Sequence, residues 1–465
     1  MPGQLLGHLR TPLYRNGYAL VASSASSSVI GVAYWIVAAR IYAPEAVGSN
    51  AAAIAAMMFL AGVAQLGLMS ALLRFIPTAG RRTAPFVMSA YLAAAPVAAL
   101  VGIVFVGGIN TWAPNLAFLG ASPTVSLWFT LGTSAWCIFA LQDSVLTGLR
   151  QAHWVLVENV AFALAKVGLL VLFVALLPEY GVLASWTAAM AVSILPTNLL
   201  IFLRLIPRHV RATAGQGEPF DAGKVIRYIP GDFLGSLCSL AAVALLPVIV
   251  AQVAGPAATA YFYIAWQVAY ALSMVSSNMG SSLVVEAARD PARLSIFSYR
   301  VMVRTFMVVG PAAGVLVLAA EPFLRVFGES YAAEGTMLLR LLALAALPHV
   351  FLSLSIGVLR VQRRTWMVVA VLALLCTLSL TLCFVLLRAY GIVGVGLGWL
   401  ASETAVALLV VLTQLLPLWG LRRRSSRDGS NTLSSPSTMA PRVVARWNDW
   451  TRLALFWRGR GNKRP

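Results

Sequence analysis

Apolar stretches of about 20 residues or more recur along the whole chain. A helix of about 20 predominantly apolar residues is what crosses a hydrocarbon core about 30 Å thick. Charged residues make up only 11% of the chain, against roughly 25% in soluble domains. The pattern predicts an all-α polytopic membrane protein. It disfavours a membrane barrel, whose strands would alternate apolar and polar side chains.

The apolar runs predict about 12 transmembrane helices. The polar segment 207–223 divides them into an N-terminal six-helix lobe, residues 1–206, and a C-terminal six-helix lobe, residues 224–418. A basic tail, residues 419–465, follows. The expected spans are Tyr14–Ala39, Ala46–Leu73, Thr83–Gly107, Pro123–Thr147, His153–Leu177, Gly181–Ile206, Lys224–Ala251, Ala257–Val284, Ser295–Ala320, Gly335–Leu359, Thr365–Leu387 and Gly391–Leu416.

The basic residues set the orientation. Of the 34 lysines and arginines, only Arg40, Arg325 and Arg388 fall on one side of these spans, and Lys166 and Arg340 fall within spans. All the others lie on the opposite side. Because cytoplasmic loops carry the excess of basic residues, both termini are expected in the cytoplasm. The protein is therefore placed in the cytoplasmic membrane, the inner membrane of a cell with two.

The two halves resemble each other in sequence. A shift of 210 residues brings Tyr180-Gly181 onto Tyr390-Gly391 and Leu149-Arg150 onto Leu359-Arg360, with no gap between the pairs. Two six-helix halves have the same orientation in the membrane. This predicts a pseudo-twofold axis along the membrane normal, with a cavity between the lobes.

The tail accounts for much of the net charge of +19. In a soluble protein this charge would favour a nucleic-acid partner, but here the basic residues lie between and after the membrane spans, so no nucleic acid is expected. Residues 442–460 place tryptophans on one helical face and arginines opposite, which favours an interfacial helix on anionic membrane lipids. The alternative is a disordered basic tail.

Four stretches together resemble the O-antigen-type polysaccharide flippases of the multidrug/oligosaccharidyl-lipid/polysaccharide (MOP) flippase superfamily. Ala39–Ala53 contains that family's Pro-Glu-x-x-Gly turn, and the resemblance extends over roughly residues 15–418. The stretches are ARIYAPEAVGSNAAA (Ala39–Ala53), GLMSALLRFIP (Gly67–Pro77), EPFLRVFGESYAAEGTMLLRLLAL (Glu321–Leu344) and LRAYGIVGVGLGW (Leu387–Trp399). The chain departs from the pattern in its alanine-rich helices and its long basic tail.

The resemblance implies movement of a lipid-linked oligosaccharide, such as a polyprenyl-pyrophosphate-linked glycan, from the inner to the outer leaflet for cell-surface polysaccharide or lipopolysaccharide synthesis. Alternating access driven by an ion gradient is the expected mechanism, and a polysaccharide polymerase and glycosyltransferases are the expected partners. One alternative is a multidrug/cation antiporter of the same superfamily. Another is a membrane scaffold that recruits synthesis enzymes through its tail.

Lys166 is the first candidate for substrate binding. It lies roughly 16–20 Å from either end of its helix at 1.5 Å per residue, too far for its side chain to reach a headgroup. It therefore either lines a water-filled cavity or pairs with a carboxylate on another helix. In the ungapped register its counterpart is Cys376, so the fold does not require a charge there. Asn159, seven residues earlier, extends a polar stripe on the same face.

Arg340 and Arg74 complete the cationic candidates. Arg340 either lines the cavity from the outer side or snorkels outward. Arg74 ends the second span, where it either meets a phosphate or follows the positive-inside rule. A cationic cavity would lower the cost of carrying a pyrophosphate through low dielectric.

Three carboxylates are candidates for ion coupling. Glu403 is central in the last span, and its counterpart in the repeat is Ser193. It is either protonated, paired with Lys166 or Arg340, or coupled to transport. Asp143 and Glu158 lie near the cytoplasmic ends of their spans, as a proton relay or as solvated interfacial groups.

No enzyme site is visible in the sequence. It has no glycine-rich ATP loop, no His, Asp or Glu cluster with metal spacing, and no long exterior loop. The four cysteines all fall in apolar segments without zinc-ligand spacing. We expect a transporter without a cofactor or metal.

Overall fold

A computed structural model of the chain describes residues 30–213 and 222–420. Helices joined by short connections make up these ranges, and no strand occurs in them. Within these two ranges, ten helices are long and apolar enough to cross a membrane, by length and composition. The all-α membrane fold is therefore confirmed. The start of the first expected span and the expected helix 442–460 lie outside the described residues.

The helices agree closely with the expected spans, and several begin with proline at the first position, where its missing N–H costs nothing. The first half contains the helix Ile30–Ile41, α3 (Pro44–Ala64), α4 (Leu68–Phe75), α5 (Thr83–Gly107), α6 (Ile109–Trp112), α7 (Pro123–Gly148), α8 (Ala152–Leu176), α9 (Gly181–Leu200) and α10 (Ile206–Ala212). The second half contains α11 (Ala222–Ala254), α12 (Pro256–Arg289), α13 (Leu294–Leu318), α14 (Ala320–Arg325), α15 (Glu329–Val361) and α16 (Thr365–Val410).

The longest of these, α16, comprises two membrane crossings. Its 46 residues would extend about 69 Å as one straight helix, more than twice a hydrocarbon core. The backbone leaves helical geometry at Tyr390 and at Gly391, which has φ 58°. Glycine adopts this left-handed conformation without steric cost. The two halves of α16 thus correspond to the two last expected spans, and Ile30–Ile41 belongs to the first.

The second expected span, Ala46–Leu73, is not one continuous helix. The chain leaves α3 at Gln65, passes through left-handed conformations at Leu66 (φ 52°) and Gly67 (φ 75°), and re-enters a helix at Leu68. A left-handed leucine costs roughly 1–2 kcal/mol. This break places Gln65 on the wall of a cavity between the lobes.

The internal repeat is visible in the backbone, but with a gap. The π-helical turns Ile201–Leu205 and Val411–Leu415 lie 210 residues apart, as the sequence register requires. The two connections that join α7 to α8 and α15 to α16, called the inner hairpins, follow a different offset. Arg150 and Arg363 both have left-handed φ and identical neighbouring backbone hydrogen bonds, 213 residues apart. The ungapped register is therefore wrong for α8 and the first half of α16, whereas the helices that follow the outer turn keep the offset of 210 residues.

The corrected register changes the counterpart of Lys166. Measured from the inner hairpin, Lys166 of α8 corresponds to Ser379 of α16, rather than to Cys376. Both Lys166 and Ser379 are buried, whereas Cys376 is half-buried. The extra three residues belong to the outer turn Leu177–Tyr180. The uncharged counterpart supports the expectation that the fold itself does not require a charge at this place.

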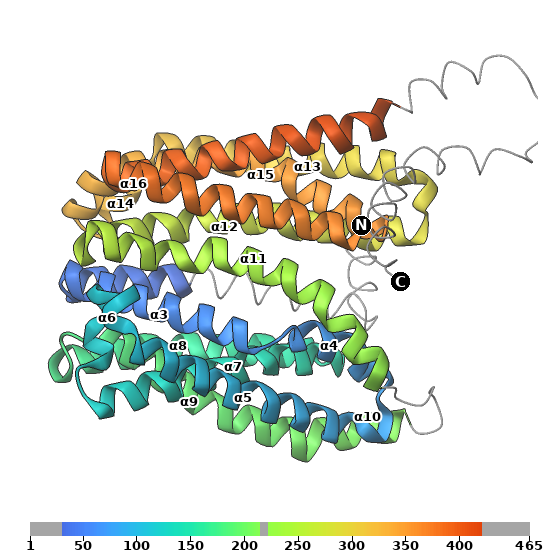
Figure 1. Ribbon diagram of the computed structural model, residues 1–465, viewed down its shortest axis with the longest axis horizontal. Coiled ribbons are helices and arrows are strands. Elements are labelled where there is room, and N and C mark those ends of the chain that lie inside the picture. Colours follow the sequence, from blue (N-terminus) through green and yellow to red (C-terminus); the bar gives the residue numbers. More distant parts are fainter. Residues whose placement is uncertain (1–29, 214–221, 421–465) are drawn as a thin grey trace, which may run out of the picture. The chain divides into compact units, whose positions relative to one another are not determined.

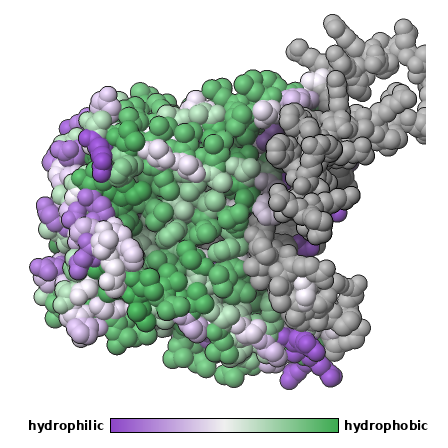
Figure 2. Space-filling model, in the orientation of Figure 1, coloured by the Kyte–Doolittle hydropathy of each residue, from purple (hydrophilic) through white to green (hydrophobic). Residues whose placement is uncertain are grey.

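The two lobes meet along α3. This helix packs against α7 and α9 of its own lobe and against α11 and α12 of the other. In Figure 1 it runs just below α11. The end that carries α4 and α10 is called the inner end, following the charge distribution, and the end that carries α6 and α14 the outer end (Figure 1). A broad apolar band covers the described helices between polar margins (Figure 2).

Hydrogen bonds join the lobes at the outer end. The Arg40 guanidinium donates from Nε to the carbonyl of Val326 at 2.8 Å and from Nη2 to that of Arg325 at 2.9 Å. Asn115 donates from Nδ2 to the carbonyl of Ala251 at 2.7 Å, and its backbone N–H donates to Gln252 Oε1 at 2.9 Å. Arg40 and Asn115 therefore satisfy carbonyls at the ends of two C-lobe helices.

Arg40→Ala is expected to loosen this outer closure. The two exposed, charge-assisted bonds together contribute about 1 kcal/mol, so the population with separated outer ends should rise about fivefold. Double electron–electron resonance between spin labels at the exposed residues Thr111 and Ala333 measures that population. Arg388→Ala is the matched control, because Arg388 is also an outer arginine but stacks on Phe384 of its own lobe. An equal shift in both variants would contradict the assignment.

Candidate functional site

Lys166 lies in an aromatic cage inside the N-terminal lobe. It is 4% exposed, and its Nζ lies 3.8 Å from the ring centroid of Trp186, 4.3 Å from that of Tyr34 and 5.1 Å from that of Phe162. An ammonium group over aromatic faces gains cation–π attraction, about 2 kcal/mol or more when desolvated. Within residues 30–213 and 222–420 no carboxylate forms an ion pair with it. The structural ion pair considered from the sequence is therefore absent from this part of the chain.

Aromatic side chains separate the cavity between the lobes from Lys166. It has a volume of about 340 Å³, and α3, α4, α7, α11 and α12 line it. Its wall is largely aromatic and apolar, with Gln65 and Gln267 as polar groups. Trp136 lies on this wall, and its ring centroid is 6.0 Å from that of Trp186. Trp186 in turn covers Lys166.

The other two cationic candidates lie elsewhere. Arg340 belongs to α15 of the C-terminal lobe and donates from Nε to the carbonyl of Val317 at 3.1 Å. That carbonyl is in the last turn of α13, where a cation is favourable because of the helix dipole. Arg74 is exposed in the last turn of α4, with its guanidinium over the Phe75 ring. The structure therefore does not bring Lys166, Arg340 and Arg74 together.

Asn159 lies beside the acidic candidates Asp143 and Glu158 rather than beside Lys166. Its Nδ2 donates to Asp143 Oδ1 at 3.4 Å and to the carbonyl of Val155 at 3.0 Å. Glu158, the residue before Asn159 on α8, is 5% exposed, and neither of its carboxylate oxygens has a hydrogen-bond partner with good geometry among the described residues. Thr197 of α9 lies against it. Asp143, Glu158 and Asn159 thus form one acidic cluster in which Glu158 is buried and the other two residues are half-buried. Simple interfacial solvation therefore does not describe Glu158.

Glu403 is paired with a residue that the sequence analysis passed over. Its Oε1 lies 3.0 Å from Nδ1 of His349 on α15, and neither Lys166 nor Arg340 contacts it. Glu403 is fully buried, and its Oε2 has no hydrogen-bond partner among the described residues. Since His349 and Glu403 both lie midway along their helices, equal membrane depth was the signal available in the sequence.

The cage residues were also missed, for a different reason. Tyr34 is far from Lys166 and Trp186 in the chain, and the three residues come from three helices. Tyr34 is held in place because its hydroxyl is 3.1 Å from the carbonyl of Val182 and 2.9 Å from Ser185 Oγ. Aromatic residues are common in apolar spans, so nothing in the sequence distinguishes these.

Comparisons with known proteins point to the same fold. No protein-family model and no curated protein matches the sequence. Among solved structures, an inward-facing multidrug resistance MATE family transporter of the MOP superfamily is 15% identical with a TM-score of 0.63, covering 87% of this chain and 96% of its own. Lipid II flippase MurJ, in an inward closed conformation, is 12% identical with a TM-score of 0.64, covering 90% and 93%.

The same fold is found in a second conformation of such a transporter. The outward-facing form of a MATE family transporter, 15% identical, has a TM-score of 0.57 over 87% of this chain and 96% of its own. At such identities the likeness shows the fold, which this chain shares with these solved transporters. The solved structures include a multidrug transporter and a lipid flippase, so the comparison does not identify the O-antigen-type branch that the sequence analysis expected.

Proposed function

We propose that this protein moves a lipid-linked oligosaccharide, carried on a polyprenyl pyrophosphate, across the cytoplasmic membrane by alternating access. The observation that carries the proposal is Lys166, a cation buried at mid-membrane without a carboxylate partner in the described residues. An isolated buried charge is expensive, and the uncharged counterpart Ser379 shows that the scaffold can do without one. A charge kept under these conditions favours a functional role.

Lys166 would meet the pyrophosphate after a rearrangement of the aromatic wall. Trp136 lines the inter-lobe cavity and Trp186 covers the ammonium group. Rotation of these rings during the exchange between inward and outward forms would expose Lys166 to the cavity. The attraction would then act only while the anion crosses the low-dielectric centre, so release at the outer side would not be opposed.

A multidrug transporter is the second candidate, and a specific observation favours it. The inter-lobe cavity is lined by Trp136, Tyr263, Trp266 and Tyr270, and by methionines, but by no charged side chain in the described residues. Aromatic faces attract organic cations, and methionine-rich surfaces accommodate ligands of different shapes. A cationic drug could bind this wall without contacting Lys166.

Mass spectrometry of lipid-linked glycans in cells that lack the protein separates the two candidates. A flippase predicts that glycan-bearing lipid intermediates accumulate in the deleted strain at least about tenfold and that the wild-type gene clears them. Arg388→Ala added back provides a surface-variant control and should also clear them. Absence of accumulation, together with increased sensitivity to cationic drugs, would instead support the multidrug transporter.

A further inference from the structure

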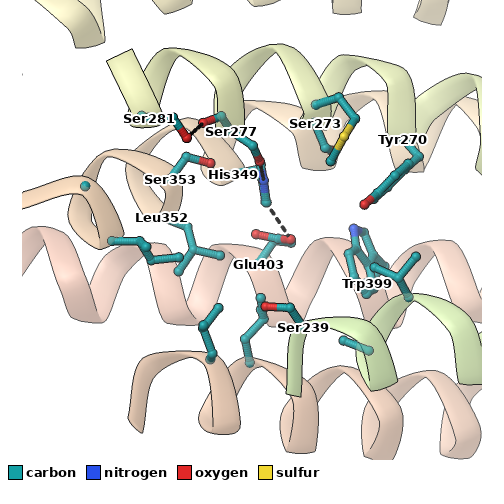
Figure 3. A pocket seen from close by; sticks show the side chains of 18 of the residues that line it. Ser239, Tyr270, Ser273, Ser277, Ser281, His349, Leu352, Ser353, Trp399 and Glu403 are labelled. Atoms are coloured by element: carbon teal, nitrogen blue, oxygen red, sulfur yellow. Dashed lines mark hydrogen bonds and ion pairs between the residues drawn. The ribbon is translucent and has the colours of Figure 1, made fainter. Parts of the chain in front are cut away.

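A second cavity lies wholly within the C-terminal lobe. Its volume is about 240 Å³, and α11, α12, α15 and α16 line it. Serine hydroxyls contribute much of its polar surface, as Figure 3 shows around His349 and Glu403. The lining serines are Ser239, Ser273, Ser277, Ser281 and Ser353. The sequence analysis named Glu403 as a candidate for ion coupling, but the proposed function does not use this cavity, which adjoins the one between the lobes at Val243 and Tyr270.

Three of the lining residues form a hydrogen-bonded chain. Glu403 Oε1 lies 3.0 Å from His349 Nδ1, and His349 Nε2 lies 3.4 Å from Ser277 Oγ (Figure 3). The carboxylate is at the closed end of the chain, with its side chain 1% exposed, whereas the imidazole is 17% exposed. The chain therefore connects a buried carboxylate to a hydroxyl on the cavity wall.

The buried carboxylate is incompletely satisfied. Glu403 Oε2 has no hydrogen-bond partner among the described residues. An ionised carboxylate with an orphan oxygen in low dielectric is costly, whereas a protonated one needs fewer partners. His349 can stabilise either state, because an imidazole donates or accepts at Nδ1 according to its tautomer and charge. The pair is thus built to exist with and without one additional proton.

The donor set argues against a metal cation. Hard cations prefer several oxygen ligands, but here an imidazole nitrogen occupies one carboxylate oxygen. In residues 30–213 and 222–420 no group of three or more His, Cys, Asp or Glu residues could hold a metal ion. The proton is the ligand that one imidazole and one carboxylate can share.

We propose that His349 and Glu403 form a proton-binding site that is loaded from the inner end through the serine-lined cavity. Along α15 the cavity extends from His349 to Arg360, eleven residues or about 16 Å, and along α12 it passes Ser277 and Ser281. Arg360 and Ser281 are exposed, whereas Glu403 is not. Water in the cavity would therefore reach the imidazole from the inner end.

Loading of the site transfers one proton from water to the His349–Glu403 pair. A proton from cavity water, directly or through the Ser277 hydroxyl, binds His349 Nε2. The Nδ1 proton of the imidazole then passes to Glu403 Oε1. The imidazole ends neutral in the opposite tautomer, the carboxylate ends neutral, and the water loses one proton. Release by the reverse sequence restores the first tautomer.

Few other titratable groups face this pair. Tyr270 of α12 and Arg360 of α15 line the same cavity. Cys238 of α11 and Cys376 of the first half of α16 lie close enough to influence each other. On the far side α13 packs with Val309 against the residues beside His349, without a titratable group in that contact. The positive charge of Arg360 at the inner mouth of the cavity repels metal cations but does not oppose the entry of water.

The proposal rests on the proposed function only for the use of the proton, since binding itself needs no substrate. Protonation is therefore measured on the purified full-length protein by infrared difference spectroscopy between mildly alkaline and mildly acidic buffer. We expect a carboxylic C=O band in the wild type that is missing from Glu403→Gln. In His349→Gln the midpoint of that band should move by about one pH unit or more, a tenfold change in proton affinity.

Glu158→Gln is the matched control, because it removes a buried carboxyl of the other lobe. The Glu403 band and its midpoint should persist in this variant. Gel-filtration profiles establish that each variant is folded. Identical difference spectra for wild type and Glu403→Gln, or an unmoved midpoint in His349→Gln, would overturn the proposal. A flippase assay that fails while the band titrates as expected would remove the proposed substrate and leave the proton site.

Discussion

Lys166→Met is expected to leave the protein folded, with an unchanged or higher melting temperature, and to reduce clearance of the glycan-bearing lipid at least about tenfold. Methionine has a similar length and no charge, and the Trp186, Tyr34 and Phe162 rings form a cage that suits an apolar side chain. Cation–π attraction contributes about 2 kcal/mol, whereas removing the ammonium from water costs several kcal/mol. The neutral variant should therefore be at least as stable.

Arg340→Met serves as the matched control for a charge in a membrane span. Arg340 donates to the carbonyl of Val317, so its replacement removes a hydrogen bond and should lower the melting temperature by a measurable amount. Clearance of the lipid intermediate should be largely retained. The pair of variants thus separates a charge used in transport from one used in folding. A Lys166→Met protein that melts lower but clears the intermediate normally would make Lys166 a structural residue.

Local sequence was sufficient for most of the helical framework. Expected and observed bounds agree at Thr83–Gly107, and the Tyr390-Gly391 turn is where two expected spans separate. Hydropathy determines such elements, because every buried backbone group in lipid must be hydrogen-bonded within its own helix. The break at Leu66–Gly67 was not predicted, because a leucine gives no sign in the sequence of the left-handed conformation that Leu66 adopts.

The candidate sites depended on contacts that the sequence does not show. The search for isolated charges found Lys166, Glu403 and Glu158, because charges are rare in membrane spans. Their partners are neutral or aromatic groups from other helices, so they remained undetected. His349 is the clearest case, since its role depends on α15 and α16 bringing it to 3.0 Å from Glu403. The three-residue difference in register likewise required the inner hairpins to be seen.

The structure gives a physical reason for the glycine of the Pro-Glu-x-x-Gly stretch. A Cβ atom at Gly48 of α3 would lie 1.8 Å from the carbonyl oxygen of Pro256 and 2.8 Å from the backbone nitrogen of Ala260. Pro256 is the first residue of α12, so backbone meets backbone across the two lobes at the outer end. Unlike a flexible side chain, neither partner can move aside without moving a helix.

Gly48→Ala should therefore separate the lobes at the outer end. Overpacking of this kind costs about 1–3 kcal/mol, which corresponds to a shift of roughly 5–150-fold in a two-state equilibrium. The distance between spin labels at Thr111 and Ala333 should lengthen, and more strongly than in Arg40→Ala. Gly168→Ala is the control, because a Cβ there meets nothing within 4 Å.

The Gly168→Ala control also accounts for the higher helix propensity that any glycine-to-alanine substitution brings. Alanine favours a helix over glycine by about 1 kcal/mol, so both variants gain helix propensity, and only Gly48→Ala adds a collision. A variant that opens at the outer end and still exchanges with the closed form would show that the Gly48–Pro256 contact sets the balance between the two. An unchanged distance distribution in Gly48→Ala would mean that α3 and α12 do not meet there in the membrane, and the outer closure would then depend on Arg40 and Asn115 alone.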